Sequence, residues 1–506
     1  MGTTPRTVLG ERPKFRAFVL SVASGLLYAL SFLPLPMGWL CWVALVPLLV
    51  AAMSDRPAAA FRHGLVAGLV GALGVGWPLP SMLVAFFGLS PTLAAVAFAV
   101  ASVGGFAIYV AVIAAWASWL AGRRMANPVI IGCGWCVSEF CRANLGIANP
   151  WALSAYSQVS FAHVTQIADV AGPYGIGFLL GAMNAALAAF FVRDTSARPI
   201  SWLVVVVGLV GVACAYGHWR LGQVFVFGEP IRIALMQGSS PAQHPITRPE
   251  QDAAFTRYVA MTHATISDAP DLVLWPENAI GFYVQEDSPR QRTLLEVSRD
   301  IPADLVLGGS SYVQGLTTVS YYNSAFLLRA GDLVDRYDKT RLMPIAEGDE
   351  LRWLRGPRSA DYERGTTVHP LPTRKAQLGV LLCSELMFPD LARRHALGGA
   401  EVLANLSNDS WFGYVVPSRF QLALASLRAI ETRRYLVRAT IGGFSAIIDP
   451  TGRIEVVSRF DAGEVVTGTV RRSQTLTPYQ RLGDASALFA AALVIVGSAY
   501  ALLERG

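Results

Sequence analysis

Three residues that could perform covalent catalysis each stand at the end of a short strand-like run. Glu277 lies two residues after the run DLVLW, Lys339 directly follows LVDRYD, and Cys383 directly follows GVLL. Short apolar runs are typical of buried β-strands, and in open α/β sheets reactive groups gather where strands end. We therefore expect a carboxylate, an amine and a thiol to form one reactive set.

A cysteine nucleophile would need help from both other residues. Only the thiolate attacks, and a free thiol has a pKa near ~8.5, so it requires a base or a nearby cation. Glu277 could accept the thiol proton if partial burial raised its pKa. Lys339 could stabilise the thiolate and then a tetrahedral oxyanion. Taken singly, Cys383 could also be a core residue, Glu277 a capping or surface carboxylate, and Lys339 a solvated charge.

The elements that would position these residues alternate in type along the polar part of the chain. Strand-like runs such as IRIALMQ, DLVLGG and EVLANLS alternate with helical patterns at 250–266, 289–299, 386–398 and 418–433. The strand runs are almost continuously apolar, which is typical of strands buried on both faces. The pattern predicts an α/β layered domain with buried sheets.

The rest of the chain has the composition of a membrane protein. Charged residues make up 15% of the 506 residues, against about 25% in a soluble protein. We expect a membrane domain at 1–222, a catalytic domain at 229–475 and a closing transmembrane helix at 485–503. The eight runs that could cross a ~30 Å hydrocarbon core lie near 15–34, 37–53, 64–88, 92–120, 127–141, 174–192, 200–218 and 485–503.

Basic residues mark alternate loops between these runs. They fall before the first run and after the second, fourth and sixth, at Arg6, Arg12, Lys14, Arg16, Arg56, Arg62, Arg123, Arg124, Arg193 and Arg198. The positive-inside rule therefore places the N-terminus in the cytoplasm. Seven spans then put the polar part on the periplasmic side, and the eighth returns the C-terminus to the cytoplasm. The first run is expected to stay as an uncleaved anchor, because no small-residue cleavage site follows it.

Charge and motifs argue against several other classes of function. The net charge is +6, but the basic residues are scattered and no nucleic-acid module is visible. The sequence shows neither a metal-ligand cluster nor a phosphate loop, since the glycines of GPYGIG follow no strand. Cys133 and Cys136 form a C-x-x-C pair inside an apolar run, which disfavours a redox role. Cys383 is the sole cysteine of the polar part, so an intradomain disulfide is excluded.

Four motifs of the polar part resemble, in order and spacing, the nitrilase (carbon–nitrogen hydrolase) superfamily. They read LVLWPENAI, YDKTRLMP, GVLLCSE and NLSNDSWFG, and they contain the three candidate residues. The resemblance implies an αββα sandwich in which Glu277 is the general base, Lys339 the transition-state stabiliser and Cys383 the nucleophile. Glu347 stands where the superfamily has a second glutamate beside the lysine.

The whole chain is similar to the apolipoprotein N-acyltransferase family, with seven spans, a nitrilase-like domain and one closing span. Further matches are NPWALSAYSQ, GPYGIGFLLG and LTPYQRLGD, and Glu385 also falls on a family position. The resemblance implies an acyltransferase of the bacterial inner membrane without cofactor or metal. Its donor would be a phospholipid, its acceptor the N-terminal diacylglyceryl-cysteine of an apolipoprotein, and its intermediate a thioester on Cys383. A backbone N–H near Ser384 would join Lys339 at the oxyanion.

Some positions depart from that family's pattern. Ser384 follows the cysteine where tyrosine is common, Ile345 and Ala346 precede Glu347 where Phe-Gly is usual, and no tryptophan follows Gln237 in the next loop. These departures concern loops that would shape the substrate sites. A diverged paralogue with another amine acceptor therefore stays open, as does a membrane-tethered amidase with the same triad. A transporter or receptor is disfavoured, because few ionisable residues fall within the spans.

Overall fold

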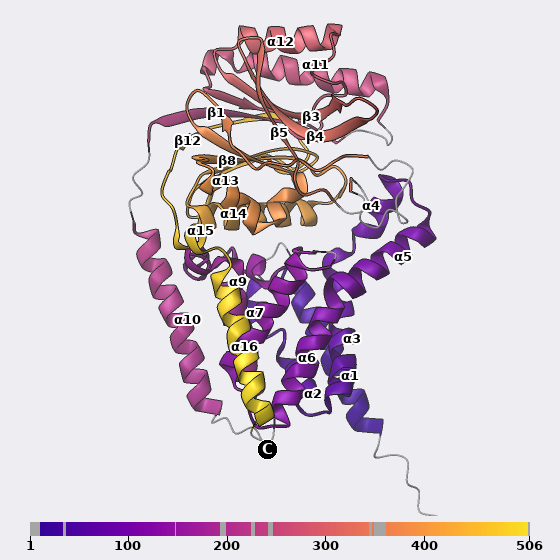
Figure 1. Ribbon diagram of the computed structural model, residues 1–506, viewed down its shortest axis with the longest axis vertical. Helices are drawn as coiled ribbons and strands as arrows, with labels where there is room; N and C mark the ends of the chain where they lie inside the picture. Colours follow the sequence, from indigo (N-terminus) through magenta and orange to yellow (C-terminus); the bar gives the residue numbers. More distant parts are fainter. Residues whose placement is uncertain are drawn as a thin grey trace, which may run out of the picture. The chain divides into compact units, whose positions relative to one another are not determined.

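The computed structural model describes residues 11–33, 37–146, 148–192, 199–223, 228–240, 246–343, 347–348 and 361–503. The chain forms two compact units (Figure 1). The first contains residues up to Trp77, Val96–Leu221 and the chain from Asp484 onward. The second contains Pro78–Ala95 and Gly222–Gly483. The second unit thus takes in a short segment that we expected to belong to the membrane domain.

The first unit is helical throughout its described part. Close approach of two of its helices depends on glycine: a Cβ on Gly64 would lie 2.5 Å from the Cα of Ala111, and one on Gly68 would lie 2.6 Å from the Cα of Ala107. Small residues that let helix backbones approach closely are typical of helix packing in membranes. The helices are α1 (Glu11–Leu30), α2 (Val46–Met53), α3 (Pro57–Gly76), α5 (Pro91–Ser102), α6 (Ile108–Ala121), α7 (Pro128–Asn144), α8 (Ala162–Thr165), α9 (Ala168–Ala188), α10 (Pro199–Leu221) and α16 (Ala485–Leu503). Helix α5 belongs to this unit from Val96 onward, and a π-helical turn, η2 (Val103–Ala107), joins it to α6.

Five helices of the described chain are long and apolar enough to cross a membrane. They cover Pro57–Gly76, Pro91–Ala121, Ala168–Ala188, Pro199–Leu221 and Ala485–Leu503. At the other expected spans, α1 carries several charges in its first turns, Gly38–Met53 is a shorter apolar helix, and α7 has 17 residues. The count of eight spans therefore stays a prediction. The expected span at 64–88 is interrupted, because α3 ends at Gly76 and α4 (Leu79–Ala85) belongs to the second unit.

The second unit contains two six-stranded sheets. Each has parallel strands at its centre and antiparallel strands toward its edges. The first sheet runs in the order β12 (Glu464–Arg471), β1 (Pro230–Gln237), β2 (Leu272–Leu274), β3 (Asp304–Gln314), β4 (Val319–Arg329), β5 (Asp332–Asp338). The second runs in the order β11 (Ile454–Val457), β10 (Ala446–Ile448), β9 (Leu436–Ile441), β8 (Val402–Asn408), β7 (Gln377–Leu382), β6 (Leu371–Pro372).

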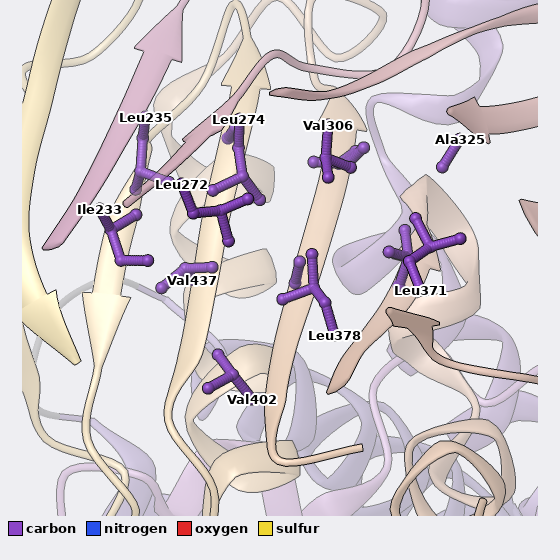
Figure 2. Packing of buried hydrophobic residues seen from close by; sticks show 14 of the residues in the cluster. Ile233, Leu235, Leu272, Leu274, Val306, Ala325, Leu371, Leu378, Val402 and Val437 are labelled. Atoms are coloured by element: carbon purple, nitrogen blue, oxygen red, sulfur yellow. The ribbon is translucent and has the colours of Figure 1, made fainter. Parts of the chain in front are cut away.

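The two sheets pack face to face through alternate side chains. Ile233 and Leu235 of β1 belong to one buried cluster with residues of the second sheet such as Leu378 (Figure 2). Ala234 and Met236 point the other way, because successive side chains of a strand face opposite sides, and they join a second cluster with α11 (Arg248–Ala264) and α12 (Pro289–Asp300). Outside the second sheet lie α13 (Pro389–Leu397) and α14 (Val415–Thr432) (Figure 1). The unit is therefore the αββα sandwich that the resemblance implied.

Candidate active site

The three predicted residues lie at the ends of strands from both sheets. Glu277 follows β2 and Lys339 directly follows β5 in the first sheet, whereas Cys383 directly follows β7 in the second. Cys383 begins a 3-10 helix, η6 (Cys383–Met387). The site is thus assembled between two facing sheets rather than along the edge of one.

A lysine between two glutamates forms the charged centre of the site. The Nζ atom of Lys339 lies 3.4 Å from Oε1 of Glu277 and 2.8 Å from Oε2 of Glu347. The side-chain amide of Asn323 donates one hydrogen bond of 2.8 Å to each glutamate. Glu347 also accepts a hydrogen bond of 2.9 Å from the backbone N–H of Met343, four residues after Lys339. Asn323 was not among the predicted residues.

Burial and charge set the protonation of this cluster. The side chains of Glu277, Lys339 and Glu347 are 0%, 1% and 4% exposed. Burial raises the pKa of Glu277, Lys339 opposes that shift, and Glu347 adds to it. Burial alone would lower the pKa of Lys339, but Glu347 and Glu277 outweigh it and raise that pKa above its usual value. Lys339 therefore stays charged while Glu277 becomes a stronger base than an exposed carboxylate.

Cys383 sits in a strained turn beside this cluster. Its φ angle of 48° lies in the left-handed region, which costs a non-glycine residue about 1–2 kcal/mol. Burial and the nearby Glu277 raise the pKa of the thiol, and Lys339 lowers it. The resting thiol is therefore protonated and needs a base. Oε2 of Glu277 accepts no hydrogen bond from any nitrogen or oxygen of the described chain, which leaves it available for that proton.

Glu385 joins the cysteine turn to the lysine loop. Its Oε2 accepts a hydrogen bond of 2.9 Å from the N–H of Leu382, just before Cys383. Its Oε1 accepts one of 2.7 Å from the N–H of Thr340, just after Lys339. The Tyr337 hydroxyl lies 3.0 Å from both oxygens. Glu385 therefore positions Cys383 and Lys339 by binding the backbone N–H next to each of them.

A second buried network holds the carbonyl side of the cysteine turn. The amide of Asn405 donates to the carbonyls of Leu381 at 2.8 Å and Cys383 at 3.4 Å. Arg438 donates to the Oδ1 atom of Asn405 and to both oxygens of Asp409, at 2.6 and 2.7 Å. An ion pair buried this deeply is tolerated because each charge is hydrogen-bonded. The network holds the backbone at Cys383 and was not predicted.

The remaining predicted positions are Ser384, Ile345, Ala346 and Gln237. Ser384 is 4% exposed, and its hydroxyl has no hydrogen-bond partner among the described residues. Ile345 and Ala346 lie outside the described residues. Gln237 accepts hydrogen bonds from Ser445 and Ser458 at the end of β1. Within the described chain, no group of three or more His, Cys, Asp or Glu side chains is arranged to hold a metal ion.

The motif NLSNDSWFG of this chain contributes Trp411 to an aromatic cluster. Trp411 stacks on Phe86 with ring centroids 5.5 Å apart and meets the edge of Phe87 at 5.2 Å. All three residues belong to the second unit. This contact explains why residues near the end of α4 belong to the second unit.

Fold and site together define a carbon–nitrogen hydrolase domain. The family model described as carbon-nitrogen hydrolase matches residues 232–477, and the model described as the apolipoprotein N-acyltransferase N-terminal domain matches residues 24–186. The apolipoprotein N-acyltransferase of Geobacter metallireducens is 32% identical over 96% of this chain and 95% of its own length. That of Nitrosomonas europaea is 30% identical over 97% of both chains.

A solved structure is also similar in part. Nit3 of Saccharomyces cerevisiae, a member of branch 10 of the nitrilase superfamily, is 19% identical, covers 54% of this chain and 97% of its own, and has a TM-score of 0.38. From the full-length matches, the chain belongs to the apolipoprotein N-acyltransferase family.

Proposed function

We propose that this protein transfers an acyl chain from a phospholipid to the N-terminal amine of a diacylglyceryl-modified cysteine on a lipoprotein. The observation that carries the proposal is the buried Lys339, paired with Glu277 and Glu347, beside a cysteine held in a strained turn. The name of its full-length relatives supports the acceptor class. Its apolar helices support a location in the inner membrane, where both lipid substrates reside.

The first half-reaction would form a thioester. Sγ of Cys383 attacks the ester carbonyl of the phospholipid while Glu277 takes the thiol proton. Lys339 and a backbone N–H near Ser384 stabilise the oxyanion. The carbon–oxygen bond then breaks, the leaving alkoxide takes the proton from Glu277, and a lysophospholipid departs. Water must be kept away from the thioester at this stage, because it could attack the thioester in place of the acceptor amine.

The second half-reaction would pass the acyl group to nitrogen. The neutral amine of the acceptor attacks the thioester carbonyl and gives a proton to Glu277. The carbon–sulfur bond breaks, the leaving thiolate takes the proton from Glu277, and the product is an amide. An ester and a thioester are close in energy and an amide lies below both, so the sequence of steps needs no nucleotide. Such chemistry suits a catalytic domain outside the cytoplasm.

The membrane arrangement is part of the proposal. Eight spans with both termini in the cytoplasm are supported by the alternation of basic loops. Cysteine labelling from either side of the membrane tests this arrangement at single engineered positions. Labelling from the periplasmic side at a position between residues 229 and 475 is expected. Labelling of that position only from the cytoplasmic side would overturn the orientation.

Complementation tests the function as a whole. The chain is expressed in a strain depleted of its own N-acyltransferase, and the N-terminus of a lipoprotein is examined by mass spectrometry. A triacylated N-terminus is expected. A diacylated N-terminus despite stable expression would overturn the proposed acceptor. Release of ammonia from small amides by the purified protein would instead favour the amidase alternative.

A further inference from the structure

A row of side chains leads away from the charged centre along one face of the first sheet. In the antiparallel pair β3–β4, Ser310 lies opposite Asn323, and Tyr312 lies opposite Tyr321. Residues two apart on a strand share a face, so both tyrosines stand on the face that carries Asn323. Asn323 binds the carboxylate of Glu277. The row therefore begins at the site of the proposed chemistry.

Three tyrosines on this row, Tyr283, Tyr312 and Tyr321, have neighbouring rings, and Tyr362 is joined to Tyr321 by an isolated backbone bridge; these four residues are here called the tyrosine strip. The ring centroid of Tyr283 lies 5.1 Å from that of Tyr312 and 6.1 Å from that of Tyr321. The rings of Tyr312 and Tyr321 are 6.3 Å apart. The hydroxyl of Tyr362 shares a hydrogen bond of 2.7 Å with Ser310, next to Asn323.

The strip changes from buried to exposed along its length. Asn323 is 1% exposed, Tyr312 is partly buried, and Tyr321 is 38% exposed. Beyond them, Leu316 at the turn of the β3–β4 hairpin is fully exposed. At the inner end, burial raises the pKa of Tyr362, with Glu347 and Glu277 adding to that shift. The strip is thus a path from the two catalytic-site carboxylates to the surface of the second unit.

We propose that the tyrosine strip binds the polypeptide that follows the acylated cysteine of the acceptor. The inference rests on the proposed function, and it names where the acceptor chain lies. The amine of the acceptor must reach the thioester near Glu277, so the chain behind it has to leave the site along some surface. The strip begins at that end, where Tyr362 binds Ser310, and reaches the surface at Tyr321.

The chemistry of the strip fits a peptide better than a lipid chain. A buried acyl chain is matched by aliphatic walls, whereas tyrosine offers a rigid ring together with a polar hydroxyl. Tyrosine-rich surfaces bind many peptide sequences, because the rings contact side chains of varied shape while the hydroxyls meet the backbone. A surface of this kind would therefore accept acceptors that differ in sequence after the cysteine.

The test compares two acceptors on the full-length enzyme. Acyl-enzyme is formed from phospholipid vesicles, and transfer is then measured to a diacylglyceryl-cysteine carrying one further residue or ten further residues. For Tyr321→Ala and Tyr312→Ala we expect kcat/KM for the long acceptor to fall about tenfold, as for the loss of one aromatic contact. The loss with the short acceptor should be much smaller. Tyr321→Phe keeps the ring and should recover most of the long-acceptor rate.

A surface control and four decisive outcomes complete the experiment. Val457→Ala, on the exposed strand β11 of the other sheet, should change neither acceptor. An equal loss with both acceptors, or no effect of either alanine, would overturn the inference. A loss confined to acyl-enzyme formation from vesicles would place the donor lipid on the strip instead and would also overturn it. If wild-type enzyme forms no acyl-enzyme at all, the proposed function itself fails, and that result is seen before any acceptor is added.

Discussion

The carboxylate of Glu385 accepts a hydrogen bond of 2.7 Å from the backbone N–H of Thr340. Glu385 stands two residues after Cys383, and Thr340 is the residue after Lys339, so this bond crosses from one sheet to the other. The same carboxylate binds the N–H of Leu382. One buried side chain therefore sets the distance between the proposed nucleophile and the proposed oxyanion stabiliser.

Replacing Glu385 by glutamine should damage catalysis more than folding. A carboxylate accepts hydrogen bonds on both oxygens, whereas an amide must turn its NH₂ group toward the N–H of either Leu382 or Thr340. We expect a loss of roughly 10²-fold in the acylation rate, as for one lost hydrogen bond to a charged group. Stopped-flow acylation and thermal unfolding measure the two effects. Glu464→Gln, in an exposed ion pair with Arg459, is the matched control, and an unchanged acylation rate in Glu385→Gln would refute the positioning role.

Removing the thiol should abolish the covalent intermediate. Cys383→Ala incubated with radiolabelled phospholipid should show no hydroxylamine-sensitive acyl adduct, because no thioester can form. Cys141→Ala should keep the adduct, since Cys141 lies on α7 in the first unit. A persistent adduct in Cys383→Ala would place the nucleophile elsewhere.

The central strands of the sandwich could be predicted from the sequence, because they are buried on both faces and read as apolar runs. The expected runs IRIALMQ and EVLANLS coincide with β1 and β8, and all seven residues of β8 are buried. Strand β9 was not predicted, since its run is broken by Arg438. That arginine is buried only because Asp409, far away in sequence, pairs with it. Tertiary ion pairs of this kind leave no local signal.

Those residues of the candidate site that follow a strand could be predicted from the sequence, whereas a residue inside a strand could not. Glu277, Lys339 and Cys383 each followed a recognisable run, and the structure brings them together. Asn323 lies within β4, and its place in the site depends on the β3–β4 register and on its hydrogen bond to Glu347. The one available signal was an asparagine at the start of the apolar run NSAFLLRA. A similar asparagine in EVLANLS is Asn405, which holds the cysteine turn.

Asn323 should matter because it keeps two carboxylates apart and oriented. Asn323→Ala removes two hydrogen bonds of 2.8 Å to charged groups, and we expect a loss of about 10- to 100-fold in acylation rate. Asn323→Asp places a third carboxylate beside Glu277 and Glu347 and should be more harmful. Acylation rates of the two variants at neutral pH check the order. Equal rates for Asn323→Asp and wild type would show that the amide has no role.

The acid limb of the pH profile should report Glu277. A general base works only when ionised, so the acylation rate falls as pH drops through its pKa. Burial and Glu347 raise that pKa, so the limb should lie above the usual glutamate value of about 4.3. Glu347→Gln removes a negative charge beside Glu277 and should therefore move the limb to lower pH, whatever its effect on the maximal rate. Single-turnover acylation, measured across the pH range in which the protein is stable, gives the acid limb of the wild type and that of Glu347→Gln. A limb that stays in place in Glu347→Gln, or moves to higher pH, would show that Glu277 is not the base whose ionisation limits the reaction.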